Sequence, residues 1–194
     1  MLRHADEPPG GFVAIYSPDM RNLLLVVVLA ACAASVFAES AAGVRWTAPA
    51  GWKAEAARPM RAATYSIPLA AGDQGIAECV VNFFGAGQGG SVEANIERWR
   101  GQVLGADGKP AVAKIDKRPG RGVPITVIDT SGTYTGMGGP MTAGAKPASG
   151  YRLMGAIAEG PGGSVFFKLT GPAKTIAAQQ KNFEQLLASI QPDK

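Results

Sequence analysis

The sequence has little of the side-chain chemistry on which most enzymes depend. Its 194 residues contain one histidine, His4, and two cysteines, Cys32 and Cys79. His4 and Cys32 lie upstream of the segment that we expect to fold. That segment then lacks a Ser-His or Cys-His nucleophile pair, a histidine for zinc, a thiolate cluster and an internal disulfide. We therefore expect a protein that is not an enzyme, with no catalytic residue, no metal site and no cofactor.

The acidic residues do not suggest a catalytic pair either. Glu78, Asp129 and Glu159 lie on or at the ends of expected strands. Nothing in their spacing brings two carboxylates together across a cleft, as carboxylate-pair hydrolysis needs. We expect Asp129 to be a solvent-facing strand residue or the partner of an arginine such as Arg152. Cys79 lies in an apolar strand, which predicts an inert core thiol.

The positive charge is too dilute for a nucleic-acid-binding protein. Without the first 38 residues, the chain keeps 17 Lys and Arg against 12 Asp and Glu, a net charge of +5. A nucleic-acid binder concentrates such charge in a stripe. The densest basic run is Lys114, Lys117, Arg118 and Arg121, which Asp116 interrupts. This run indicates a solvated strand end and turn, or contact of Arg118 and Arg121 with an acidic partner or anionic lipid.

Residues 20–38 have the composition of an export signal, and the acidic, Pro- and Gly-containing residues 1–19 are expected to be dispensable. Met20-Arg-Asn precedes LLLVVVLAACAASVFA, so a positive charge is followed by an apolar run and small residues. We expect the signal to start at Met20 and to be cleaved after Ala38, which leaves 39–194 as one globular domain. Leu29-Ala-Ala-Cys32 also matches a lipobox, so lipidation of Cys32 is the alternative, and it would anchor the protein by lipid alone. Both alternatives place the protein in the periplasm or cell envelope.

A strand, a glycine loop and a helix are predicted within AECVVNFFGAGQGGSVEANIERWRGQ, residues 77–102. Residues 76–84 are apolar on both faces, which is typical of an interior strand. Ser91 is a good N-cap residue. The stripe of the following helix consists of Val92, Ile96, Trp99 and Val103, and Gly101 and Gly105 end the helix.

Gly85, Gly87 and Gly90 match the G-x-G-x-x-G pattern of dinucleotide-binding loops. That fingerprint also needs an acidic residue at the end of the next strand, about 20 residues on. The chain has GADGKPAVAK there, which is a turn before any strand. We therefore expect these glycines to allow a tight crossover from strand to helix rather than to bind a nucleotide.

The remaining segments indicate an α+β fold. Further strands are expected at 44–47, 60–67, 111–117, 124–134, 151–159 and 164–170. The strand at 111–117 is expected at a sheet edge, with Lys114 and Lys117 discouraging edge-to-edge pairing. A second helix is expected from Pro172 to Pro192, with the stripe Ile176, Phe183, Leu187 and Ile190. We predict an antiparallel sheet of about six or seven strands packed by two main helices, on one face or on both.

Two segments resemble PsbP-like domains. Trp46-x-x-Pro49-x-Gly-Trp52 is similar to their opening segment, and FFKLTGPAKTIAAQQKNFEQLLASI is similar to their last strand, linker and helix. The chain also resembles a group of exported bacterial proteins that carry the run FGAGQGGSVEANIERW. The resemblance implies a PsbP-like sandwich and accessory work, such as stabilising larger assemblies. It implies no site residue.

Two functions follow as hypotheses. The first is an exported, non-catalytic accessory domain that binds an unknown protein of the cell envelope. Its contacts would be Gly87 and Gln88 of the glycine loop, Met137 and Met141 of the Gly-rich loop 136–149, and the arginines of the basic run. The second is a periplasmic carrier of a small molecule or lipid, with a pocket between sheet and helix.

Overall fold

The computed structural model describes residues 38–136 and 147–193. Neither helix in these ranges has the length and the apolar run needed to cross a membrane. The expected signal from Met20, the lipidation candidate Cys32 and the loop residues Met137 and Met141 lie outside the described residues.

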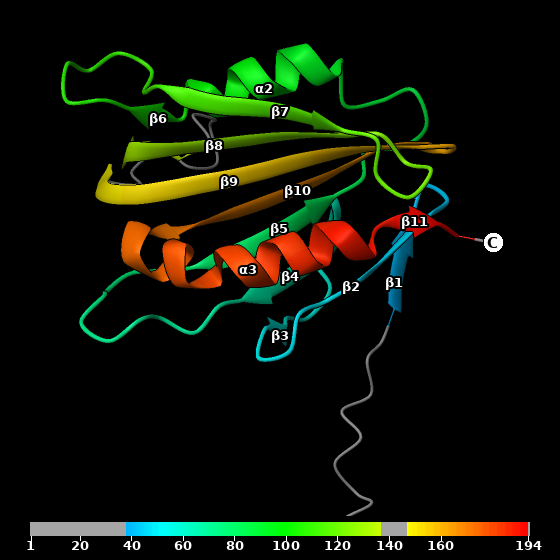
Figure 1. Ribbon diagram of the computed structural model, residues 1–194, viewed down its shortest axis with the longest axis horizontal. Coiled ribbons are helices and arrows are strands. Elements are labelled where there is room, and N and C mark those ends of the chain that lie inside the picture. Colours follow the sequence, from blue (N-terminus) through cyan, green and yellow to red (C-terminus); the bar gives the residue numbers. More distant parts are fainter. Residues whose placement is uncertain (1–37, 137–146, 194) are drawn as a thin grey trace, which may run out of the picture. The chain divides into compact units, whose positions relative to one another are not determined.

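Eleven strands form two antiparallel sheets in the described residues (Figure 1). The main sheet has the order β3-β4-β5-β10-β9-β8-β6, and β7 also pairs with β8; β1, β2 and β11 form a small sheet. The bounds are β1 Ala38–Ala41, β2 Val44–Thr47, β3 Lys53–Ala54, β4 Arg61–Ser66, β5 Glu78–Asn82, β6 Val103–Leu104, β7 Ala113–Arg118, β8 Ile125–Tyr134, β9 Ala148–Gly160, β10 Gly163–Pro172 and β11 Gln191–Pro192.

This arrangement confirms the predicted α+β class with an antiparallel sheet and two helices. The main sheet has eight strands rather than six or seven. The difference arises because β3 and β6 have two residues each, too few for a periodic pattern, whereas the expected strand 44–47 lies in the small sheet. The predicted interior strand, β5, pairs with β4 and β10, and the expected strands at 151–159 and 164–170 form the hairpin of β9 and β10. The pairing of β8 with β9 has a register shift between Gly132 and Tyr134.

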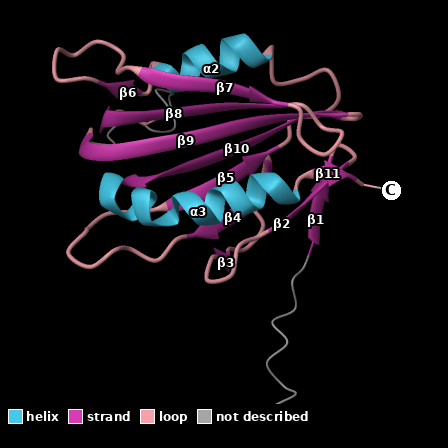
Figure 2. Ribbon diagram, in the orientation of Figure 1, coloured by secondary structure: helices cyan, strands magenta, loops and turns pink. Residues whose placement is uncertain are grey.

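The two helices pack on opposite faces of the main sheet (Figure 2), an arrangement that the sequence leaves open. Helix α3, Ala173–Ser189, shares the larger core with the small sheet and contributes Ile176, Phe183, Leu186 and Leu187. Helix α2, Val92–Arg100, covers a smaller core through Ile96 and Trp99. Gly155 of β9 makes room for α2, because a Cβ atom there would lie 2.5 Å from the Trp99 ring.

Helix α2 begins and ends at the predicted residues. The Ser91 hydroxyl accepts from the Ala94 amide at 3.1 Å, and Gly101 is the C-cap. Asn95, which is buried, fastens the glycine loop, because its amide donates to the Gly89 carbonyl at 2.7 Å. Val103, predicted on the stripe of this helix, instead lies in β6, although it is buried in the same core.

Both predicted proline boundaries of α3 are shifted. Pro172 is the N-cap rather than the first helical residue, because it still pairs with Tyr151 at the end of β10. The helix ends at Ser189, before Pro192, because the buried C-cap Ile190 is extended. Gln191 and Pro192 then pair with β2. The carboxy-terminal end of the described chain is therefore tied into the small sheet.

Candidate functional site: a basic face beside helix α2

Lys168 lies in the middle of β10, the central strand of the main sheet. Its neighbours on the adjacent strands are Val80 of β5 and Gly155 of β9. Because side chains alternate along a strand, Lys168 lies on the same face as Phe166, which belongs to the core under α2. A lysine at such a position loses much of its hydration and needs polar partners.

The ammonium group of Lys168 has weak partners. Its Nζ donates to the Gln102 side-chain oxygen at 3.4 Å and to the Tyr134 hydroxyl at 3.3 Å, and it lies 5.9 Å from the centre of the Tyr134 ring. In the described ranges, no carboxylate forms an ion pair with it. Burial lowers the pKa of Lys168 to about 8; Glu78 raises it, and Arg98 and Arg61 lower it further. The charge is therefore only partly compensated.

Two stacked tyrosines stand next to this lysine. The rings of Tyr134, at the end of β8, and Tyr151, in β9, lie 6.1 Å apart at an angle of 5°. Burial raises the pKa of Tyr134 to about 12, so its hydroxyl stays protonated at neutral pH. The stretch 132–151, which joins the two tyrosines, contains no acidic residue. The sequence of this connection therefore offers no carboxylate to neutralise Lys168.

An open hollow of about 560 Å³ adjoins Lys168 on the α2 side. Its lining is Phe84, Glu97, Arg98, Gly101, Gln102, Thr135 and Gly136. Gln102 belongs to this lining and also accepts a hydrogen bond from Lys168, so the hollow lies next to a partner of the lysine. We call Arg61, Arg98 and Lys168 the basic face, because Arg61 and Arg98 are close enough to Lys168 to lower its pKa.

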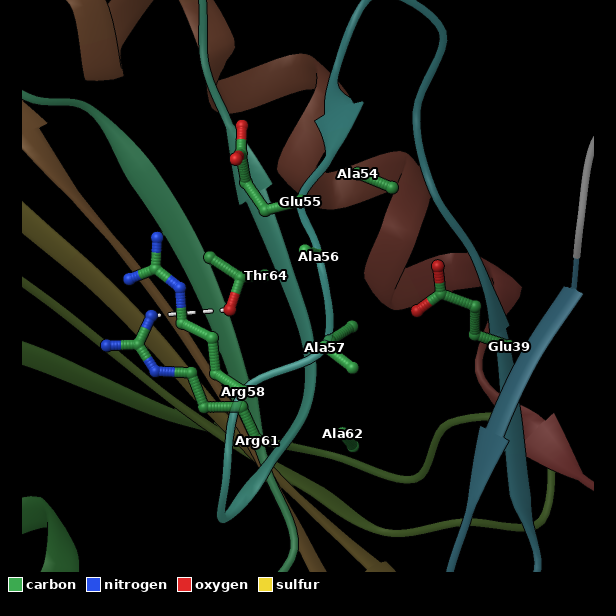
Figure 3. A pocket seen from close by; sticks show the side chains of 10 residues that line it. Glu39, Ala54, Glu55, Ala56, Ala57, Arg58, Arg61, Ala62 and Thr64 are labelled. Carbon is green, nitrogen blue, oxygen red and sulfur yellow. Dashed lines mark hydrogen bonds between the residues drawn. The ribbon is translucent and has the colours of Figure 1, made fainter.

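A smaller pocket of about 140 Å³ borders the basic face at Arg61 (Figure 3). The Arg61 side chain donates to the Thr64 hydroxyl at 3.3 Å and lies 3.6 Å from the Glu78 carboxylate. Figure 3 shows the Arg58 side chain extending to the same side as Arg61, while Glu39 of β1 lies across the pocket. Two neighbouring guanidinium groups increase the positive potential at this end of the sheet.

The Glu39 side of this pocket is held by a buried hydrogen-bond chain. The Trp46 indole donates to the Tyr65 hydroxyl at 2.8 Å, and that hydroxyl donates to Glu39 at 2.6 Å. Burial, followed by the hydrogen bond to Glu39, raises the pKa of Tyr65 well above its usual value. These two hydrogen bonds join β1 of the small sheet to β4 of the main sheet, so their role is structural.

No protein-family model and no curated protein matches the sequence. The fold is similar to the solution structure of PsbP from the cyanobacterium Synechocystis sp. PCC 6803, with a TM-score of 0.47, 13% identity, and coverage of 80% of this chain and 90% of the other. It is also similar to the crystal structure of PA94, a Pseudomonas aeruginosa protein of unknown function, with a TM-score of 0.44, 11% identity, and coverage of 80% and 96%. A PsbP is thus among the similar structures, in agreement with the resemblance of the sequence.

The residues predicted to contact a partner that lie in the described ranges come from three separate segments. Gly87 and Gln88 are exposed in the loop before α2, and Arg121 is exposed in the turn between β7 and β8. Arg118 is held within the chain, because its guanidinium binds Glu184 of α3 and also Asp116, at 3.2 Å. The Gly87 loop is closed by a hydrogen bond from the Gln88 amide to the Gly85 carbonyl at 3.0 Å, as a tight crossover requires.

Two predictions about single residues are confirmed. Asp129 is the partner of Arg152, which donates to its two carboxylate oxygens at 2.8 and 2.6 Å. Cys79 is fully buried in the larger core, and burial raises the pKa of its thiol. Within the residues described, no group of three or more His, Cys, Asp or Glu could hold a metal ion.

Lys168 is absent from the residues that the sequence predicts as a site. The sequence does carry a signal for Lys168, because it is the lone charge within the apolar stretch VFFKLTG. This stretch lies at the centre of the second strand of the hairpin. In the sequence of this strand alone, the lysine has the pattern of a residue that faces solvent. Only the pairing of β10 between β5 and β9 places it on the central strand of the sheet.

Proposed function

We propose that this chain is an exported accessory domain that binds an acidic protein partner and does not transform it. The basic face is the proposed contact surface. The observation that carries the proposal is Lys168, a half-buried ammonium on the central strand that the described residues leave without an ion pair. An uncompensated charge of this kind is costly to the folded protein, so a role in binding accounts for its presence.

The surroundings of Lys168 favour a carboxylate from outside the chain. Arg61 and Arg98 add positive potential, and Glu78 is the carboxylate that opposes them within the face. The Gln102 side chain and the Tyr134 hydroxyl already orient the ammonium group. An Asp or Glu side chain entering the hollow would complete the ion pair in a partly desolvated place, where charged hydrogen bonds are strong.

The openness of the hollow favours a protein over a small molecule. Small-ligand sites bury most of their ligand in a concave cavity, whereas the 560 Å³ hollow lies between exposed residues of α2 such as Glu97 and Arg98. A projecting acidic side chain fits such a surface. Gly87 and Gln88 in the loop before α2 are proposed as the edge of the same contact, and Met137, Met141 and Arg121 as further contacts.

Photo-crosslinking in cells that make the protein tests this proposal. A benzoylphenylalanine at position 97, which lines the hollow but is not part of the basic face, should capture one defined partner, and the same group at position 181, on an exposed part of α3, should not. Lys168→Glu should abolish the adduct from position 97, whereas Lys168→Arg should keep it. Raising the salt concentration during preparation should weaken the interaction, because the contact is electrostatic. An adduct that survives Lys168→Glu would reject the basic face as the contact.

A carrier function is the second candidate, and the hollow between α2 and the sheet favours it. Phe84 and the Gly101 backbone provide apolar lining, and Arg98 could bind an acidic headgroup. Native mass spectrometry of the protein isolated from its own cells distinguishes the two functions. A bound small molecule that Lys168→Glu releases would support the carrier, and ligand-free protein that binds its partner would support the accessory domain.

A further inference from the structure

Strand β7 presents an exposed edge. Ala113–Arg118 pairs with β8, and among the strands of the described residues it has no second neighbour. Lys114, Ile115, Asp116 and Lys117 are exposed, and Ile115 keeps 47% of its surface in contact with solvent. Unpaired backbone groups along such an edge can accept another strand.

The side chains on either side of Ile115 in β7 carry opposite charges. Lys114 precedes it and Asp116 follows it, so two opposite charges flank an exposed apolar residue. Both charged side chains lie on the α3 face of the sheet, because Lys114 pairs with Asp129 and Asp116 pairs with Val127 of that face. Ile115 points to the other face.

When two copies of one strand pair antiparallel about a two-fold axis, each residue must oppose a residue of the same face. The axis then passes through one residue, which meets its own copy. With Ile115 on the axis, Lys114 opposes Asp116 of the second copy, and Asp116 opposes its Lys114. The two isoleucines meet at the centre and two opposite-charge pairs flank them.

The neighbouring registers are unfavourable. With Asp116 on the axis, the two Asp116 carboxylates would face each other, and Lys114 would oppose Arg118 of the second copy. With Lys114 on the axis, the two lysines would face each other. Like charges placed directly opposite in a sheet are destabilising. The charge pattern therefore selects the register through Ile115.

Both charged groups have free capacity for this pairing. Lys114 forms no ion pair within the described part of the chain. Asp116 uses one carboxylate oxygen for Arg118, at 3.2 Å, which leaves the other oxygen available. The predicted role of Lys114, to discourage edge pairing, holds against an arbitrary strand but not against one that places an aspartate opposite it.

We propose that this protein forms a symmetric dimer in which two β7 strands pair antiparallel through Ile115 and join the two main sheets. The partner is a second copy of the chain. This inference does not depend on the proposed function, because the basic face consists of Arg61 of β4, Arg98 of α2 and Lys168 of β10, and no residue of β7 belongs to it.

Sedimentation of the purified full chain over a concentration series measures the dimer. Lys114→Asp and Asp116→Lys should each raise its dissociation constant about tenfold or more, because both charge pairs become repulsive. An equimolar mixture of the two variants should form heterodimers, and the double variant K114D/D116K should dimerise like the parent protein. Lys117→Asp, which makes the same charge change opposite Ala113, should have a much smaller effect.

Disulfide formation tests the register. A cysteine in place of Ile115 should link two copies under mild oxidation, whereas one in place of Lys117 should not, because its two copies would lie about 13 Å apart along the strands. The parent protein is the control. Any disulfide that it forms between two copies comes from Cys32, because Cys79 is buried. A protein that stays monomeric at millimolar concentration, or a dimer that neither single charge variant weakens, would overturn the proposal.

Discussion

Replacing Lys168 by methionine should stabilise the protein while removing its proposed binding. Methionine fills a similar volume without a charge. The pKa of Lys168 is lowered from 10.5 to about 8 in the folded protein. This shift means that folding disfavours the charged form of the side chain by about 3 kcal/mol relative to the neutral form. The side chain keeps some contact with water, and its two weak hydrogen bonds would be lost. We therefore expect Lys168→Met to raise the free energy of unfolding at pH 7 by about 1–2 kcal/mol.

The gain should depend on pH in a defined direction. Below about pH 8 the lysine is charged in both the folded and the unfolded protein, so the cost of burying the charge is fully present. Between pH 8 and 10.5 the folded protein loses this proton while the unfolded protein keeps it, so the parent protein gains stability relative to the variant. Above pH 10.5 the advantage of Lys168→Met should have disappeared.

Urea denaturation at pH 7 and at pH 10.5 measures both effects. Other titrating groups cancel in the difference between parent and variant, provided that the denaturant slope is unchanged. Lys117→Met on the exposed part of β7 is the control and should differ little from the parent at either pH. A Lys168→Met protein that is less stable at pH 7, or a difference that stays constant to pH 10.5, would refute the idea that Lys168 is under-compensated.

Two further substitutions test the packing that supports the site. Gly155→Ala should lower the free energy of unfolding by about 1–3 kcal/mol and change Trp99 fluorescence, because the added Cβ would lie 2.5 Å from that ring. Gly101→Ala, where φ is −66°, is the near-neutral control. Equal stabilities of the two variants would contradict the packing of α2 against Gly155. Tyr65→Phe should lower stability by about 1–3 kcal/mol in urea denaturation, because it leaves the buried Trp46 indole N–H without its acceptor, and an unchanged midpoint would contradict this.

Local patterns in the sequence predict the centre of the fold. The segment from β5 to α2 is recognisable because its strand, its glycines and the N-cap Ser91 each act through neighbouring residues. The β9–β10 hairpin is recognisable for the same reason, since only Pro161 and Gly162 separate its strands. The pairing of Asp129 with Arg152 also follows, because both side chains lie on adjacent strands that the hairpin order makes neighbours.

Pairings between distant segments could not be predicted in this way. The small sheet joins residues near position 40 to Gln191 and Pro192, and no local pattern encodes that contact. Pro172 and Pro192 have ordinary helix-boundary signatures, yet each is held in a strand. Pro172 pairs with Tyr151 at the far end of the β9–β10 hairpin, and Pro192 pairs with Val44, which is remote in sequence. Tertiary pairing overrides the local preference in both cases, as it commonly does at element boundaries.

Lys168 shows why the candidate site needs the three-dimensional arrangement. The sequence displays its basic residues most densely in the run at 114–121, but this run contains Arg118, whose charge Glu184 and Asp116 already neutralise. The basic face instead draws one cation each from β4, α2 and β10, over a sequence span of more than 100 residues. A binding site assembled in this way leaves a single charge in each element, and a single charge in one element has no distinguishing pattern. What marks Lys168 is the mismatch between its charge and its place on the central strand, and measuring the cost of that mismatch is the most direct way to learn whether the site is functional.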